Sequence, residues 1–251
     1  DGSCRVKPHW AVVNNAVRGA LAGAAVITGG GALAGASIKA ASDAQQSLGA
    51  TETVFKRASS TIVKYSDRAA MKYGLSANQY RESANLIGSL FKNQGVATDQ
   101  LAGKTDKMVG RASDLAATFG GTTSDAVGAL SSAFKGEFDP LEAYGISLKQ
   151  SQVNTEAMRL ANVKSKKEWD ALSLSQQKNA TQQATTNLIM GQSKDSAGAF
   201  AKEANTLAGQ QQRLGAAWED GKATLGRGLL PVLTTGLTKL TGFVQGMREG
   251  A

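Results

Sequence analysis

The stretch that decides the fold is residues 74–148, GLSANQYRESANLIGSLFKNQG (74–95), TDQLAGKTDKMVGRASDLAATFGG (98–121) and TTSDAVGALSSAFKGEFDPLEAYGISL (122–148). Apolar side chains recur there at spacings of three and four residues, which is the period of an amphipathic helix. Glycine follows each apolar run. The stretch therefore predicts four short helices, and the short connections between them favour antiparallel packing in a small bundle.

Local capping signals predict where these helices begin and end. Ser76 and Gln79 form a capping box, and Gly95 is a typical stop for the helix that they open. The next helix opens at Thr98 and closes at Gly120-Gly121. The other expected boundaries are Thr123 or Ser124 as a cap, Gly136 as a stop, Asp139-Pro140 as an N-cap followed by proline, and Gly145 as the last stop. The expected core positions are Tyr80, Ala84, Ile87, Phe91, Leu101, Met108, Ala112, Leu115, Phe119, Val127, Leu130 and Phe134.

The amino-acid sequence of this stretch also resembles that of a known family. GLSANQYRESANLIGSLFKNQG, SDLAATFGG and FKGEFDPLEAYGISL are similar to the core region of the tail tape measure proteins of long-tailed bacteriophages. The segment ASIKAASDAQQSLGATETVFKRAS before it, and AKEANTLAGQQQRLGAAWEDGKATLGRGLLPVL after it, extend the resemblance. The resemblance covers roughly residues 36 to 233.

A tape measure protein lies inside the tail of the virion, sets tail length as the tube polymerises around it, and leaves ahead of the DNA at infection. The resemblance thus implies a virion protein of the tail lumen that is present in the host cytoplasm during assembly. Some members of the family carry enzymatic modules, but this sequence has no cluster of catalytic groups and is expected to be non-enzymatic. The implied partners are further copies of the chain, the tail tube protein, tail assembly chaperones, distal tail or baseplate proteins, and the host membrane.

The sequence divides into four expected regions: an apolar Ala/Gly-rich segment at 1–38, a connecting amphipathic helix at 39–73, the central bundle at 74–161, and long helices ending in an apolar segment at 162–251. In the connecting region Ala44, Val54, Phe55, Ile62 and Tyr65 share helical spacing. Tyr73-Gly74 is the expected stop of that helix.

Two apolar stretches favour a second interpretation. Residues 19–37 carry no charge, and residues 229–247 carry Lys239 alone. The first is at the lower limit of length for a membrane span and is weakened by Gly29-Gly30-Gly31. A membrane-active helical protein that forms a pore or anchor is therefore an alternative function. A buried or self-packing Ala/Gly helix is the preferred interpretation of residues 19–37.

The same glycines loosely match a dinucleotide-binding fingerprint, with Ala25–Thr28 as a strand before Gly29-x-Gly31-x-x-Ala34. That fingerprint needs a parallel sheet, and the later sequence lacks strands alternating with helices. A phosphate-binding loop would also need lysine where Ala36 stands. No nucleotide or other cofactor is expected.

The C-terminal part predicts further helices. Ser147 with Gln150, and Ser165 with Glu168, form possible capping boxes. Ala180, Ala184 and Leu188 carry a helix to Gly191. From Ser196 a regular stripe of apolar positions predicts one helix of roughly thirty residues that ends near Pro231 and needs a partner helix along its length. That stripe is Phe200, Ala204, Leu207, Gln211, Leu214, Trp218, Leu225 and Leu229.

The charge is +8, from 28 basic and 20 acidic residues, with the basic excess in the two arms. Lys164, Lys166 and Lys167 stand beside Trp169, a combination that can stack on nucleic acid. A helix start at Ser165 explains the same residues. Non-specific DNA binding by the basic arms is a further alternative, and it would weaken steeply with salt.

No catalytic, cofactor-binding or metal-binding residue is predicted. His9 and Cys4 are the only histidine and cysteine, which is too few ligands for a structural zinc site and leaves no base for a nucleophile. Carboxylates such as Glu219-Asp220 are not arranged as a catalytic pair. Finally, 251 residues of continuous helix span about 380 Å. This is short for a long tail, so the chain is expected to be a piece of a longer ruler.

Overall fold

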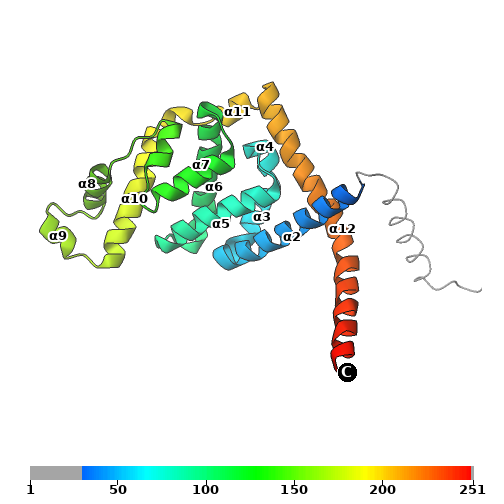
Figure 1. Ribbon diagram of the computed structural model, residues 1–251. Coiled ribbons are helices and arrows are strands. Elements are labelled where there is room, and N and C mark those ends of the chain that lie inside the picture. Colours follow the sequence, from blue (N-terminus) through cyan, green and yellow to red (C-terminus); the bar gives the residue numbers. More distant parts are fainter. Residues whose placement is uncertain (1–29, 250–251) are drawn as a thin grey trace, which may run out of the picture. The chain divides into compact units, whose positions relative to one another are not determined.

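The computed structural model describes residues 30–249 and is all-α over that range, with no strand (Figure 1). The predictions for residues 1–29, including the strand of the nucleotide fingerprint and most of the apolar segment 19–37, lie outside the described residues, whereas Gly31 and Ala34 of the fingerprint lie in a helix. The helices are α2 (Gly30–Phe55), α3 (Ser59–Ser66), α4 (Ala69–Tyr73), α5 (Ala77–Asn93), α6 (Thr98–Phe119), α7 (Thr123–Ala133), α8 (Gln150–Leu160), α9 (Lys166–Asp170), α10 (Leu174–Gln192), α11 (Ala199–Glu203) and α12 (Leu207–Glu249), with 3-10 helices η1 (Lys56–Ala58), η2 (Asp139–Tyr144) and η3 (Lys194–Ser196).

The chain divides into two compact units, at positions that differ from the four regions expected from sequence. The bundle unit is Asp43–Asp220, and the arm unit combines the chain before Asp43 with the chain after Asp220. The bundle unit thus begins earlier and ends later than the predicted bundle of 74–161. This follows from packing, because Phe55, Ile62 and Ile189 belong to the same hydrophobic core as the central helices.

The core of the bundle unit lies where α3, α5, α6, α7 and η2 pack together. Most positions expected in the core are buried, and the largest side chains that are almost fully enclosed are Tyr80, Phe55, Ile62, Ile87, Leu101, Met108, Leu115, Leu130, Leu141, Ile146, Ile189 and Val109. Phe119 is the exception, since it is 49% exposed. Its ring lies against Gly145 instead, at the end of η2.

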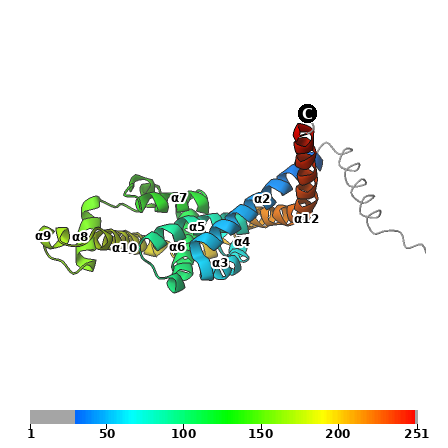
Figure 2. The same cartoon turned by 90° about the horizontal axis from the view of Figure 1, so that it is seen from below.

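A smaller cluster joins α8 to α10. Val153, Ala157, Ala180 and Ala184 are buried there, and Trp169 packs against them. In both views of the bundle unit, α8 and α9 lie beside the end of α10 that is far from α6 (Figure 1, Figure 2). Leu188 and Phe138 touch this cluster as well as the main core, so the two are continuous.

The expected connecting helix at 39–73 is wrong as a single element. The chain forms α2, η1, α3 and α4 in its place, and the break falls at Lys56, whose φ is +50°. A left-handed residue ends one helix axis and starts another. The new direction lets Ile62 enter the core, while Gly74, with φ +64°, ends α4 as predicted.

Several predicted caps are confirmed and others are displaced. Ser76 and Gln79 form the expected capping box at the start of α5. The cap of α7 is Thr122, whose hydroxyl accepts a hydrogen bond from Asp125 N–H, and neither Thr123 nor Ser124 has that role. Asp139 begins η2, where Phe138 is the N-cap. Ser147 does not cap α8, because its backbone N–H and carbonyl both bond to the side chain of Gln192.

The predicted thirty-residue helix is wrong at both ends. A break at Ala204–Thr206 separates α11 from α12, and Thr206 Oγ1 accepts a hydrogen bond from Gly209 N–H to start the second helix. Pro231 lies inside α12, which continues to Glu249. Proline has no backbone N–H and so removes one hydrogen bond of the helix, but α12 continues beyond it.

In the arm unit, the part of α12 around Gly226 packs closely on α2. A Cβ atom at Gly226 would overlap the backbone carbonyl of Ser37 and contact Ala41. Ala41 and Ala223 are buried in the same region. The arm unit is therefore a helix–helix contact made by small residues. No helix among residues 30–249 has the length and apolar character that a bilayer span requires.

Candidate interaction surface

Three features of the bundle unit were candidates for function: a polar cluster at Asp106, a pocket between α6 and α10, and the exposed face of α12. Within residues 30–249 no three His, Cys, Asp or Glu side chains come together as metal ligands do. His9 and Cys4 lie outside the described residues. In each of the three features, the side chains are held in place by the helices on which they lie.

The polar cluster joins α4, α5 and α6 at Asp106. The hydroxyls of Tyr73 and Tyr80 each donate a 2.8 Å hydrogen bond to Oδ1 of Asp106, and Lys72 donates one of 2.9 Å to Oδ2. The two tyrosine rings stack with centroids 5.8 Å apart. Burial and then the nearby Asp106 carboxylate raise the pKa of both tyrosines above its usual range. Every polar group is satisfied within the cluster, which gives it a structural role.

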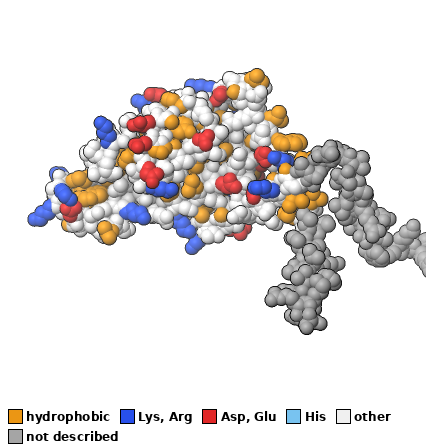
Figure 3. Space-filling view, in the orientation of Figure 1, with side chains coloured by type: hydrophobic (Ala, Val, Ile, Leu, Met, Phe, Trp, Pro, Cys, Tyr) orange, Lys and Arg blue, Asp and Glu red, His pale blue; other side chains and the backbone are white. Residues whose placement is uncertain are grey.

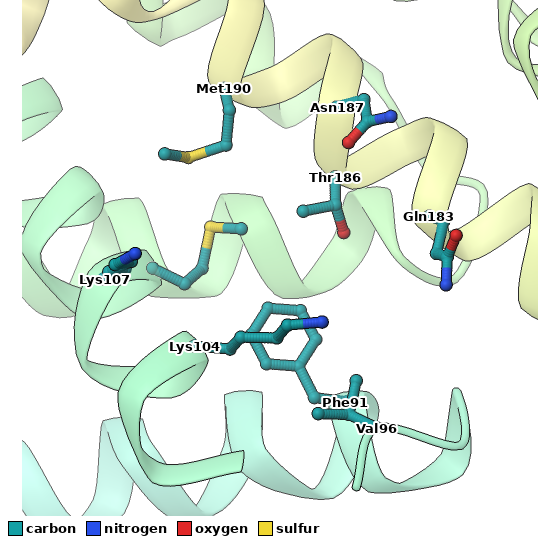
Figure 4. Close-up of a pocket in the computed structure, with 9 residues that line it drawn as sticks. Phe91, Val96, Lys104, Lys107, Gln183, Thr186, Asn187 and Met190 are labelled. Carbon is teal, nitrogen blue, oxygen red and sulfur yellow. The ribbon is translucent and has the colours of Figure 1, made fainter. Parts of the chain in front are cut away.

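The pocket lies between α6 and α10 and has a cavity volume of about 370 Å³ (Figure 4). Phe91, Met108 and Met190 are its apolar lining residues, and Lys104 and Lys107 come from α6. Neither lysine forms an ion pair with a residue in the described range. The pocket accepts an apolar group beside a negative charge, but it is open and has no buried polar side chain aimed into it.

The face of α12 that turns away from the bundle carries large apolar side chains. Leu207 is 73% exposed, Leu214 is 71% exposed and Trp218 is 59% exposed. Figure 3 shows hydrophobic side chains gathered along the edge that the first part of α12 forms in that view. The sequence predicted this stripe and its need for a partner, but placed Phe200 and Ala204 on it. Those two residues are buried in and beside α11.

Contacts on the opposite side hold the start of α12 in this orientation. Asp220 Oδ1 accepts a 2.8 Å hydrogen bond from Ala77 N–H at the start of α5. Gln212 lies against Gly74, and Ala216 is buried. The Arg213 guanidinium stands 5.7 Å from the ring centroid of Phe200. All of these residues belong to the bundle unit.

A second contact set fixes α11, which precedes α12. The carboxylate of Asp114 on α6 accepts hydrogen bonds from the backbone N–H groups of Gly198 and Phe200, at 2.9 and 3.2 Å. Arg111 donates a 2.6 Å hydrogen bond to the carbonyl of Ser193. These contacts could not be expected from sequence, because each pairs a half-buried residue of α6 with backbone about eighty positions away.

The lysine cluster beside Trp169 is built as a helix start. Ser165 Oγ accepts a hydrogen bond from Glu168 N–H, and Lys166 forms an ion pair with Asp170 at 3.1 Å. Trp169 is half-buried against α8 and α10. Its ring therefore has a packing role. The helix start at Ser165 explains the neighbouring lysines without a ligand.

Comparison with known proteins gave no further identification. No protein-family model, no curated protein and no solved structure matches the chain. The function of the surfaces described above is therefore inferred from their chemistry and from the resemblance of the amino-acid sequence.

Proposed function

We propose that the chain is a structural component of a phage tail, a segment of a tape measure protein that sets tail length while the tube assembles and is released with the DNA at infection. The observation that carries the proposal is the amino-acid sequence of residues 74–148 and 196–233, which resembles the core of that family. The proposed segment is part of a longer ruler.

The properties of the described helices support this proposal. A ruler has to convert chain length into physical length, and an α-helix does so at about 1.5 Å per residue. The 43-residue helix α12 is an element of this kind. In the bundle unit the side chains of Ser76, Thr122 and Ser173 cap α5, α7 and α10, and glycines with positive φ, such as Gly95 and Gly136, follow α5 and α7.

The proposed partners follow from the resemblance and from the exposed face of α12. Further copies of the chain would lie alongside it, with the tail tube protein around them and with assembly chaperones and distal tail proteins at other stages. The large apolar side chains of that face are suited to protein contacts, because exposed apolar patches on proteins commonly mark interfaces.

The experiment is a matched deletion and duplication of residues 74–148 in the phage or prophage that encodes the chain. If this segment is measured as helix, seventy-five residues correspond to about 110 Å of tail. Electron microscopy of negatively stained virions should show tails shortened by the deletion and lengthened by the duplication. Tails of unchanged length in both variants would overturn the ruler role for this segment.

A matched control uses substitutions that leave the chain length unchanged. Gly103 and Gly128 have open space at the position of a Cβ, so alanine at both sites alters no packing contact. Virions with both alanines should have tails of normal length. A change in this control would show that tail length depends on stability and not on residue number.

A further inference from the structure

The space between α6 and α10 in the bundle unit is bounded by a contact at each end. At one end Gly95, in the turn before α6, lies against α10, since a Cβ atom there would be 3.3 Å from Nδ2 of Asn179. At the other end Arg111 of α6 donates a 2.6 Å hydrogen bond to the carbonyl of Ser193. The part of α10 from Asn179 to the end of the helix is about 20 Å long. The name α6–α10 groove is used below for the cavity between these two contacts.

The α6–α10 groove carries positive charge. Lys104 and Lys107 are exposed at its α6 side, and α10 contains no aspartate or glutamate. Asp106 lies between the two lysines in the sequence, but Lys72 and two tyrosine hydroxyls already hold its carboxylate. Like charges three residues apart on a helix repel each other. The two lysines are therefore placed to gain from a negatively charged partner.

The interior of the α6–α10 groove is apolar and adaptable. Phe91 and Met108 are 3% and 2% exposed, and Val96 and Met190 are half-buried. Methionine side chains are flexible and fit apolar groups of different shapes. The cavity volume of about 370 Å³ lies within the range of sites that hold apolar ligand groups. The groove thus offers an apolar seat directly beside its positive charges.

We propose that the α6–α10 groove binds an acidic amphipathic peptide segment of another protein. Its apolar side chains enter between Met108 and Met190, and its carboxylates pair with Lys104 and Lys107. Amphipathic helices are commonly recognised in this way, with the apolar face in a groove and charges at the rim. This inference goes beyond the proposed function and rests on the groove alone, so peptide binding and the tail-length result can fail separately.

The form of the α6–α10 groove favours a peptide over the other anionic ligands. In Figure 4 the labelled side chains of α10 lie above the labelled lysines of α6, and the exposed Gln183 and Asn187 give the α10 side a polar rim. An open groove with polar groups spread along a helix suits a length of chain. A nucleic acid would stack its bases on exposed aromatic rings, but the ring of Phe91 is buried.

The first test measures fluorescence anisotropy of a labelled synthetic peptide added to the purified full chain. The probe has leucines at spacings of three and four residues and glutamates at the other positions. It should bind saturably with a dissociation constant on the order of 100 μM, since the contact area is small. High salt should weaken the binding. A matched peptide with lysine in place of each glutamate should not bind.

Two variants separate the charges of the groove from its apolar seat. K104E/K107E should weaken binding by about tenfold or more, because both lysines then repel the peptide. K64E/K135E changes the net charge equally at exposed positions outside the groove and should keep the wild-type affinity. Gln183→Trp leaves the charge unchanged and fills the cavity, so it should also weaken binding. Circular dichroism checks that each variant keeps its helices.

The second test locates the peptide by NMR of the methionine methyl groups, of which the chain has five. The signals of Met108 and Met190 should shift on titration, and those of Met71 and Met158, which lie on α4 and α8, should not. Absence of binding, binding that survives K104E/K107E, or shifts at Met71 or Met158 alone would overturn the proposal. A single-stranded DNA oligonucleotide that shifts Met108 and Met190 where the acidic peptide does not would also overturn it.

Discussion

The hydroxyl of Tyr80 donates a 2.8 Å hydrogen bond to the same carboxylate oxygen of Asp106 that accepts one from Tyr73. Tyr80 is fully buried, and the Asp106 side chain is 14% exposed. Replacement of Asp106 by alanine leaves two tyrosine hydroxyls without their acceptor. We expect Asp106→Ala to lower the free energy of unfolding by about 3 kcal/mol, the cost typical of removing a charged partner from buried donors. Urea unfolding at neutral pH measures this directly.

The control for this variant is Asp195→Ala. Asp195 is exposed in η3 and forms no ion pair with another described residue, so its loss should change the free energy of unfolding by no more than about 0.5 kcal/mol. Equal effects of the two variants would contradict the role assigned to Asp106. The urea dependence of the unfolding free energy should stay the same in both, since the buried area is unchanged.

The same cluster predicts how stability depends on pH. Burial, and then Asp106, raise the pKa of Tyr80 in the folded chain above the value of about 10 that it has when unfolded. The contribution of Tyr80 to stability is thus fully present below about pH 10. It is lost as the pH rises further, because the unfolded chain then releases the tyrosine proton and the folded chain keeps it.

The measurement is urea unfolding of wild type and Tyr80→Phe between pH 8 and pH 11. The wild-type free energy of unfolding should fall more steeply above pH 10, with a difference in slope of at most about 1.4 kcal/mol per pH unit. Titration of lysines affects both chains equally and cancels in the comparison. Parallel curves for the two chains would show that Tyr80 titrates normally in the folded state.

Gly88 and Gly103 provide a matched pair with opposite expected effects. Both lie inside helices, where alanine normally stabilises by about 1 kcal/mol. Gly103 has open space at the position of a Cβ, so Gly103→Ala should raise the midpoint of thermal unfolding. A Cβ at Gly88 would overlap the buried ring of Phe55, so Gly88→Ala should destabilise by about 2 kcal/mol. Stabilisation by both alanines would mean that Phe55 does not pack on α5.

The helices of the bundle unit could be predicted because their signals are local. Ser76 and Gln79 lie three residues apart and cap α5 as expected. The period of the apolar residues likewise predicted the burial of Leu101, Met108 and Leu115. Caps, glycine stops and helical period all act within one or two turns, so the sequence alone contains them.

The remaining elements could not be predicted because distant residues decide them. Ser147 has the sequence signal of a cap, but Gln192 bonds to both of its backbone groups. Thr123 was a reasonable candidate cap for α7, yet its hydroxyl donates to the carbonyl of Tyr73 and Thr122 takes the capping role. The stripe of apolar positions from Phe200 to Leu229 was recognised as a pattern. Which members of that pattern are exposed depends on the break before α12, for which the sequence has no glycine or proline signal.

Lys56 provides a last test of the break between α2 and α3. Its φ of +50° lies in the left-handed region, where a side chain with a Cβ costs about 1 kcal/mol relative to glycine. Lys56→Gly should therefore leave the free energy of unfolding unchanged or raise it by up to about 1 kcal/mol. Lys64→Gly, at an exposed position inside α3, should lower it by about 1 kcal/mol because glycine is a poor helix former. If both glycines destabilise equally, α2 and α3 form one continuous helix in solution, as the sequence pattern alone predicts. Opposite signs would establish that the turn at Lys56, and with it the position of Ile62 in the core, exists in the folded chain.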